Sequence, residues 1–123
     1  MGGDLKLLMA EDNEINRKLA DLLFKRQGFN LDFAVNGEAA LESAVSGSYD
    51  LIFMDIEMPI MGGLEATRRI QDEMGDSAPP IIALTAHAMD GDRERFIEAG
   101  MSDYLTKPID LGALQEIISR HTS

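Results

Sequence analysis

Short apolar runs alternate with helical patterns five times along the chain, and this alternation constrains the fold more than any other feature. The runs LKLLMA, LDFAV, LIFM, IIALTA and DYLTKP begin at residues 5, 31, 51, 81 and 103. Apolar residues between the runs recur every three to four positions, the pattern of a helix with one buried face. Strands joined by right-handed helical crossovers run parallel, with helices on both faces. The sequence therefore predicts an α/β fold with a five-stranded, parallel, doubly wound sheet in three layers.

The apolar face of each helical pattern predicts which residues pack on the sheet. The expected inward residues are Ile15, Leu19, Leu22 and Leu23; Leu41, Ala44 and Val45; Leu64, Thr67, Ile70 and Met74; Phe96, Ile97 and Ala99; and Leu111, Leu114, Ile117 and Ile118. We expect Leu19 to belong to the core, and Asp110 to cap the last helix.

Length and composition limit the classes of protein to consider. The 123 residues suffice for one domain but not two, and the absence of cysteine excludes disulfides and thiolate metal sites. No apolar run approaches the roughly 18 residues of a membrane span. We expect a cytoplasmic location, either of a free protein or of the cytoplasmic portion of a membrane-bound sensor, without membrane contact by this domain. The first three residues, MGG, are expected to be a cloning remnant.

The formal net charge of −11 bears on partners. Nucleic-acid binding begins with clustered Lys and Arg, so we expect no direct contact with nucleic acid. The charge suits a cation or a basic partner, although a solvated acidic surface accounts for most of it.

Acidic residues directly follow two of the apolar runs. Glu11 and Asp12 come after the first run, and Asp55 ends the third. Because parallel strands end at the same edge of a sheet, we expect these carboxylates to lie together. Two carboxylates about 4 Å apart repel by roughly 4 kcal/mol at an effective dielectric of about 20, so the cluster needs a cation or raised pKa values. Oxygen ligands favour Mg²⁺. Alternatively, Glu11 and Asp12 merely cap the first helix.

A hydroxyl and an ammonium lie near the ends of the last two runs, at Thr85 and Lys107. Asp55 would keep one oxygen that can act as a nucleophile. An acidic nucleophile, a divalent cation, a hydroxyl and an ammonium together suit a phosphoryl group, whose oxygens must be neutralised on several sides. Taken singly, Thr85 and Lys107 are weak signals; their position at successive strand ends makes them candidates.

The motifs MAEDN, MDIEMPIMGG, ALTAHA and YLTKP resemble those of receiver domains, the phosphoaccepting modules of two-component signalling. The resemblance covers essentially the whole chain, residues 1–123, and implies the flavodoxin-like (βα)5 receiver fold. The stretches EDNEIN and LTAHAM are most similar to receivers of hybrid sensor histidine kinases or phosphorelays.

The resemblance implies an acceptor and a metal site. Asp55 would accept a phosphoryl group from a phosphohistidine, so the domain would catalyse only its own phosphorylation and dephosphorylation. Asp12, Asp55 and the backbone carbonyl of Glu57 would bind Mg²⁺ (or Mn²⁺), with Glu11 assisting through water.

The resemblance also implies a phosphate site and a switch. Lys107, the Thr85 hydroxyl and the Ala86 N–H would bind phosphoryl oxygens, and the bond from Lys107 to Pro108 is often cis in relatives. On phosphorylation Thr85 would move toward the phosphoryl group and Tyr104 would turn inward. The alternative for Tyr104 is an edge-strand aromatic half in water.

A kinase or a histidine-phosphotransfer domain would dock near Asn13, Ile15, Asn16 and Pro108, with Ile109 bordering the contact. We expect a monomer or a weak dimer. His87 is interpreted as a loop residue that modulates water access, or as simply exposed to solvent, and His121 is expected to have no role. In the loop after Asp55, Gly62-Gly63 should permit positive φ and close backbone approach, while Met58 and Met61 pack on the sheet edge.

Three other functions stay open on the sequence alone. A phosphohydrolase with an aspartyl-phosphate intermediate usually needs a second aspartate where this chain has Glu57, and a cap domain for which there is little room. A flavodoxin-like cofactor binder should cradle phosphate in its first loop, where the acids of EDNEIN would repel it. A degenerate receiver that serves only for docking would not need the intact acid set.

Overall fold

The computed structural model describes residues 5–86 and 91–122. Within these ranges five parallel strands form one sheet in the order β2-β1-β3-β4-β5. The strands are β1 (Leu7–Ala10), β2 (Leu31–Ala34), β3 (Leu51–Asp55), β4 (Ile81–Thr85) and β5 (Asp103–Thr106). The chain goes from β1 outward to β2, then returns past β1 to β3, so the strand order reverses between β1 and β3. The carboxyl ends of these two strands therefore flank the switch point at which doubly wound sheets bind ligands.

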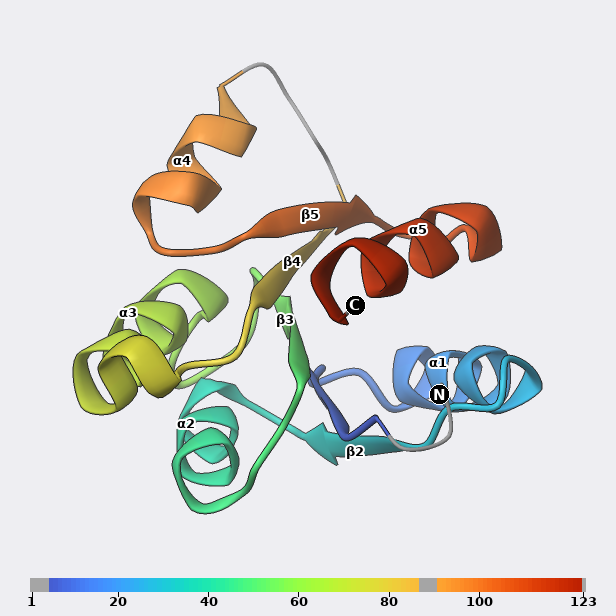
Figure 1. Cartoon of the computed structure of the whole chain (residues 1–123), viewed down its shortest axis with the longest axis horizontal. Helices are drawn as coiled ribbons and strands as arrows, with labels where there is room; N and C mark the ends of the chain where they lie inside the picture. Colours follow the sequence, from blue (N-terminus) through green and yellow to red (C-terminus); the bar gives the residue numbers. More distant parts are fainter. Residues whose placement is uncertain (1–4, 87–90, 123) are drawn as a thin grey trace.

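Five helices cover the two faces of the described sheet (Figure 1). They are α1 (Glu14–Arg26), α2 (Gly37–Ser46), α3 (Gly63–Met74), which is followed by the 3₁₀ turn η2 (Gly75–Ser77), α4 (Asp92–Glu98) and α5 (Leu111–Thr122). Helices α1 and α5 lie on one face and α2, α3 and α4 on the other (Figure 1). The predicted three-layer fold is confirmed. The last strand, predicted over 103–108, ends at Thr106, before the cis Lys107–Pro108 peptide bond.

Each face of the sheet has its own apolar core. All five residues of β3 are buried, and their alternation sends Phe53 toward α1 and α5 and Met54 toward α2 and α3. The Phe24 ring of α1 meets Phe53 edge to face, with 5.3 Å between centroids. Burial of each such side chain contributes about 1.5–3 kcal/mol. Two filled cores fix the ends of the strands, which carry the functional residues.

The predicted inward face of α1 is only partly confirmed, because Leu23 alone of its four residues packs against the core. Leu19, expected in the core, is 60% exposed, whereas α1 buries Ala20 and Phe24. Small Ala20 lets the helix approach the sheet closely and Phe24 fills the space beside it, so the packed face lies about 100° round the helix from Leu19. The other expected inward residues that are exposed are Ile15, Leu22, Val45, Ile97 and Leu111.

Side-chain caps fix where several helices begin. Asn13, Asn36 and Asp110 each accept a hydrogen bond from the backbone N–H three residues further on, at 2.9, 2.8 and 2.9 Å. The predicted cap at Asp110 is thereby confirmed. The alternative that Glu11 and Asp12 cap the first helix is wrong, because Asn13 does so. The carboxylates of Glu11 and Asp12 are therefore available for another role.

In residues 5–86 and 91–122, no helix has both the length and the apolar character that a membrane crossing requires.

Candidate functional site

Three carboxylates meet at the carboxyl ends of β1 and β3. One oxygen each from Glu11, Asp12 and Asp55 lies within 4.8 Å of the other two. Glu11 and Asp55 are only 2% and 6% exposed, whereas Asp12 is open to solvent. These three acids line a cleft of about 250 Å³ together with Glu57, Thr85, Ala86 and Lys107. The strand-end argument thus correctly predicted that residues far apart in sequence share one site.

The loop of residues 56–62 holds Asp55 in place. Its first N–H, at Ile56, donates to the carbonyl of Leu84 at 3.0 Å and so extends the β3–β4 pairing by one residue. The N–H of Glu57 donates to Asp55 Oδ1 at 3.1 Å. A Cβ at Gly63 would stand 2.2 Å from the Asp55 carbonyl oxygen, which confirms the predicted close approach. The predicted positive φ is not at either glycine of the pair but at Ile60, with φ 69°.

Lys107 bridges two of the acids. Its Nζ lies 2.6 Å from Glu11 Oε1 and 3.0 Å from Asp55 Oδ2. Its backbone N–H donates to the Thr85 carbonyl at 2.8 Å, so the end of β4 fixes the start of the lysine side chain. Burial alone would lower the pKa of Lys107, but its hydrogen bonds to both carboxylates raise it, and the ammonium stays charged.

The crowded acids have displaced pKa values. Burial, together with the neighbouring Glu11 carboxylate, raises the pKa of Asp55 to about 6 despite Lys107. For Glu11, burial works against ionisation, yet the hydrogen bonds from Lys107 and from the Asn13 N–H hold its pKa below the ordinary value. One lysine thus compensates only part of the negative charge. A divalent cation at the same oxygens would compensate the rest.

The donor chemistry fits a hard cation. The clustered ligand atoms are all carboxylate oxygens. The chain has no cysteine, and His121 lies elsewhere, beside Asp103. Oxygen-only clusters of this charge suit Mg²⁺ or a similar ion. The residues present therefore fit the predicted metal.

The predicted switch residues occupy neighbouring strands. Thr85 is the buried last residue of β4, and Tyr104 on β5 pairs in register with Ala83. The Tyr104 ring is half-buried and lies 6.1 Å from the Phe96 ring of α4, measured between centroids. This position agrees with the half-wet edge aromatic considered from the sequence.

An apolar groove adjoins the acidic cleft. It has a volume of about 290 Å³ and is lined by Leu19, Leu23, Pro108 and Ile109 among others, and Asn16 lines both the groove and the cleft. The exposed Leu19 that was expected in the core is thus part of a surface beside the site. Asn13 also lines the cleft, and Ile15 is exposed on α1.

Sequence reasoning missed several contacts. Arg17 Nη1 donates to the Glu11 carbonyl at 2.9 Å. The spacing of charged residues in the sequence did not predict this contact between the first turn of α1 and the acidic pair. His121, expected to have no role, lies 3.2 Å from Asp103 Oδ2, which also accepts from Arg120 at 2.7 Å.

Met61 is buried and Met58 packs partly on the core, as predicted. His87 lies outside the described residues.

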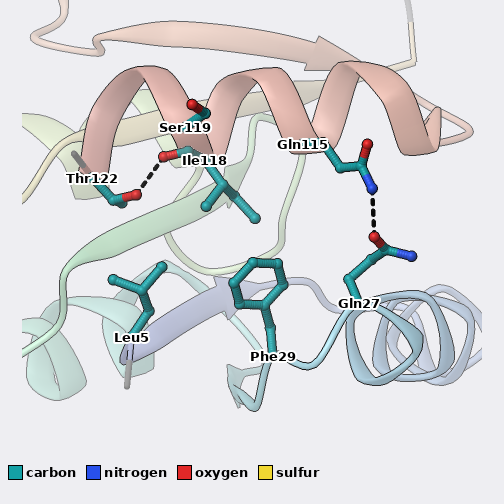
Figure 2. Close-up of a pocket in the computed structure, with 7 residues that line it drawn as sticks. All are labelled: Leu5, Gln27, Phe29, Gln115, Ile118, Ser119 and Thr122. Carbon is teal, nitrogen blue, oxygen red and sulfur yellow. Dashed lines mark hydrogen bonds between the residues drawn. The ribbon is translucent and has the colours of Figure 1, made fainter. Parts of the chain in front are cut away.

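A third cavity, of about 310 Å³, lies between the α1–β2 connection and α5 (Figure 2). Leu5, Phe29 and Ile118 point into it, and Gln115 donates to Gln27 across one end. All its lining side chains are uncharged. It therefore lacks the ligands that the acidic cleft provides.

A doubly wound sheet with an acidic, lysine-bridged cleft at its switch point defines a module that can hold a cation and a phosphoryl group. Residues 7–119 match the family model described as "Response regulator receiver domain". The chain belongs to the response regulator receiver family. It serves as a receiver domain of two-component and phosphorelay signalling.

Three relatives illustrate the family. The chain is 48% identical over 122 residues to hybrid signal transduction histidine kinase I of Dictyostelium discoideum, covering 93% of this chain but 7% of that protein. The receiver domain of sensor histidine kinase PA1611 from Pseudomonas aeruginosa PAO1, crystallised with magnesium in its active site cleft, has a TM-score of 0.87 and 38% identity, covering 96% and 97% of the two chains. The receiver of Ssk1, crystallised with the histidine phosphotransfer protein Ypd1 from Saccharomyces cerevisiae, has a TM-score of 0.88 and 30% identity, covering 96% and 88%.

Proposed function

We propose that residues 1–123 form one receiver domain in which Asp55 accepts a phosphoryl group from a phosphohistidine. The observation that carries this proposal is the environment of Asp55. Its carboxylate is nearly buried, lies among two other acids and has an ammonium 3.0 Å away. A buried acid that is reached through one cleft suits a nucleophile that forms a covalent phosphoryl intermediate, because its surroundings limit hydrolysis of that intermediate by water.

In this proposal Asp12, Asp55 and the backbone carbonyl of Glu57 hold Mg²⁺ (or Mn²⁺), and Glu11 assists. The clustering of the carboxylate oxygens within 4.8 Å and the position of Glu57 on the cleft wall support this ligand set. A bound ion would supply positive charge that offsets the charge of the phosphoryl oxygens.

The transfer exchanges one bond at phosphorus. An oxygen of the Asp55 carboxylate forms the new P–O bond, and the P–N bond of a phosphohistidine protonated at its other ring nitrogen breaks. The electron pair of that bond stays on nitrogen, so histidine leaves as neutral imidazole. Lys107 pairs with a phosphoryl oxygen, and the Thr85 hydroxyl and Ala86 N–H bind the others.

Lys107 would have to exchange partners during this reaction. It contacts both Glu11 and Asp55 before transfer. The new phosphoryl oxygens offer it more negative charge at the same place, so the ammonium can follow them with a small movement. The Thr85 hydroxyl and Tyr104 ring would then respond as a two-state switch. The half-buried position of Tyr104 beside Phe96 supports this role.

The apolar groove beside the cleft supports docking of a histidine kinase or histidine-phosphotransfer domain near Asn13, Ile15, Asn16 and Pro108. Its apolar wall can bury a partner's side chains while its shared residues keep the cleft open to the incoming phosphohistidine. Because the chain spans 7% of its Dictyostelium relative, we further propose that it works as the cytoplasmic receiver of a hybrid kinase, as a monomer or weak dimer.

The decisive experiment is phosphorylation by a small phosphodonor. We expect phosphoramidate with Mg²⁺ to add one phosphoryl group per chain, measured by intact mass, and EDTA to prevent it. Asp55→Asn should abolish the label, whereas Asp72→Asn, a change at an exposed residue of α3, should not. A label that survives Asp55→Asn would reject the assignment. Continuous turnover of small phosphomonoesters would instead favour a phosphohydrolase.

A further inference from the structure

Ile60 combines two properties that are unfavourable for the free domain. Its φ of 69° is left-handed, and it is the non-glycine residue with positive φ among residues 5–86 and 91–122. A β-branched side chain is strained in this region, which glycine or asparagine adopts more readily. The residue is also 78% exposed, so burial of its side chain contributes little stability to the free domain.

Backbone contacts impose this conformation without using the Ile60 side chain. The N–H of Met61 donates to the Pro59 carbonyl at 2.7 Å, and the Met61 carbonyl accepts from the Gly37 N–H at 3.1 Å. These bonds fix the loop on both sides of residue 60. An asparagine could satisfy the same backbone at lower cost, so the fold itself does not account for isoleucine. Strain of this kind is often retained where a side chain is used in function.

The location of the loop suggests what the side chain contacts. Ile56 and Glu57, from the same loop, line the acidic cleft through which Asp55 is reached. A phosphohistidine carried on a folded protein must bring its surface down onto the cleft rim to reach a residue that is 6% exposed. A small phosphodonor can enter the cleft without contacting its rim. The apolar groove with Leu19 and Pro108 adjoins the same cleft and shares Glu11, Asn16 and Lys107 with it.

We propose that Ile60 is a specificity-determining contact that inserts into an apolar surface of the protein phosphodonor, the domain that carries the phosphohistidine. Together with the groove, it gives that donor a second apolar contact near the cleft. Burial of the side chain on docking contributes free energy that the exposed side chain does not contribute in the free domain. This inference rests on the proposed function of Asp55.

The test compares two donors on the 123-residue chain and on Ile60→Asn. One donor is phosphoramidate. The other is a purified, phosphorylated histidine-phosphotransfer protein, chosen because it phosphorylates the unmodified chain. We expect Ile60→Asn to lower kcat/KM for the protein donor about tenfold, as loss of one buried apolar contact would. Labelling by phosphoramidate should stay within about twofold, and Tm should rise by about 3–5 °C as strain is relieved.

Two further variants sharpen the comparison. Ile60→Val keeps a branched apolar side chain and should retain most of the protein-donor rate. Val45→Asn changes an exposed branched residue on α2, 44% exposed and near the end of the helix remote from the cleft, and should leave both rates unchanged.

The outcomes separate the two proposals. Protein-donor transfer within about twofold of the unmodified chain would overturn the role of Ile60, whether or not Tm rises. An equal loss with both donors would also overturn it, because Ile60 would then act by positioning the loop. Failure of the unmodified chain to be labelled on Asp55 by phosphoramidate would instead reject the proposed function.

Discussion

Lys107 lies 3.0 Å from the carboxylate of Asp55 and 2.6 Å from that of Glu11. Its ammonium therefore contacts two of the three carboxylates that a divalent cation would bind. Lysine and a divalent ion are both attracted by the same oxygens, and each reduces the free energy that the other gains there. The lysine would therefore oppose the proposed metal binding in the resting domain, although its proposed function is to stabilise the phosphoryl group.

This competition predicts opposite effects of Lys107→Met on binding and on phosphorylation. Removing the ammonium frees two carboxylates, so we expect Mg²⁺ to bind several-fold more tightly. Labelling by phosphoramidate at saturating Mg²⁺ should slow at least tenfold, because one phosphoryl oxygen loses its positive partner. Calorimetric titration and intact mass measure the two effects. Lys25→Met, at a solvent-exposed ion pair on α1, is the control and should change neither. Weaker Mg²⁺ binding in Lys107→Met would contradict the competition.

Asp55→Asn should stabilise the metal-free domain at neutral pH. The pKa of Asp55, raised by burial to about 6, exceeds that of an unfolded aspartate. As pH rises from about 4 to 6 the unfolded chain loses this proton more readily than the folded one, so the stability of the original protein falls. We expect Asn to raise the free energy of unfolding by about 1–2 kcal/mol at pH 7 in EDTA, after allowance for solvent screening.

The pH dependence of this gain identifies its cause. Urea unfolding at several pH values should show the advantage of Asp55→Asn shrink as pH falls and disappear near pH 3, below the unfolded pKa of about 3.9, where Asp55 is mostly protonated in both states. Saturating Mg²⁺ should stabilise the original protein more than the variant. The difference between their free energies of unfolding at pH 7 should therefore become smaller. An advantage that is constant from pH 3 to pH 8 would mean that Asn acts through packing rather than charge.

The site could be predicted from the sequence because the strand topology alone brings its residues to one edge of the sheet. Asp55, Thr85 and Lys107 lie at or near the ends of successive apolar runs, and parallel strands end at one edge whatever the details of packing. The partners of Lys107 were not predicted, because the reach of its side chain to Glu11 depends on the depth of the cleft. Arg17 was missed for the same reason.

Packing details were less predictable. Periodicity could not decide between the Ile15–Leu19–Leu22 stripe of α1 and the adjacent face with Ala20 and Phe24, because a buried alanine contributes little to an apolar pattern. The sequence predicts a positive φ at the glycines after Asp55, yet hydrogen bonds of Met61 impose it on Ile60. Such constraints come from contacts distant in sequence.

Asp103 should stabilise the fold at neutral pH but not in acid. Burial favours its neutral form, yet the Tyr104 N–H, His121 and Arg120 together lower the pKa of Asp103. Because the folded pKa lies below the unfolded value near 3.9, the stabilisation is present above about pH 4 and is lost as pH falls through the folded pKa. Asp103→Asn should cost up to about 1 kcal/mol at pH 7, since Arg120 is exposed and its pair is screened.

Thermal unfolding of Asp103→Asn at several pH values tests this contribution. The difference from the original protein should be similar at pH 5 and 7 and should shrink below pH 4. Glu42→Gln, at an exposed residue of α2, serves as a surface control and should show little difference at any of these pH values. A cost of Asp103→Asn that grows in acid would reverse the sign of the argument.

Two adjacent glycines make a matched test of how backbone packing positions the phosphoacceptor. A Cβ at Gly63 would meet the Asp55 carbonyl oxygen at 2.2 Å, whereas one at Gly62 would lie 3.4 Å from the nearest atom, the Ile56 carbonyl oxygen. Gly63→Ala must therefore displace the peptide that carries Asp55, at a cost of about 2–3 kcal/mol, and Gly62→Ala should cost less than about 1 kcal/mol.

The displacement at Gly63→Ala should also impair the site beyond its effect on folding. At a temperature where the variant is fully folded by circular dichroism, we expect Mg²⁺ affinity and phosphoramidate labelling to fall at least fivefold, because Asp55 and Glu57 move together with the displaced peptide. Gly62→Ala should keep both within about twofold. If folded Gly63→Ala bound Mg²⁺ and accepted phosphoryl as well as Gly62→Ala does, the contact between Gly63 and Asp55 would serve folding alone.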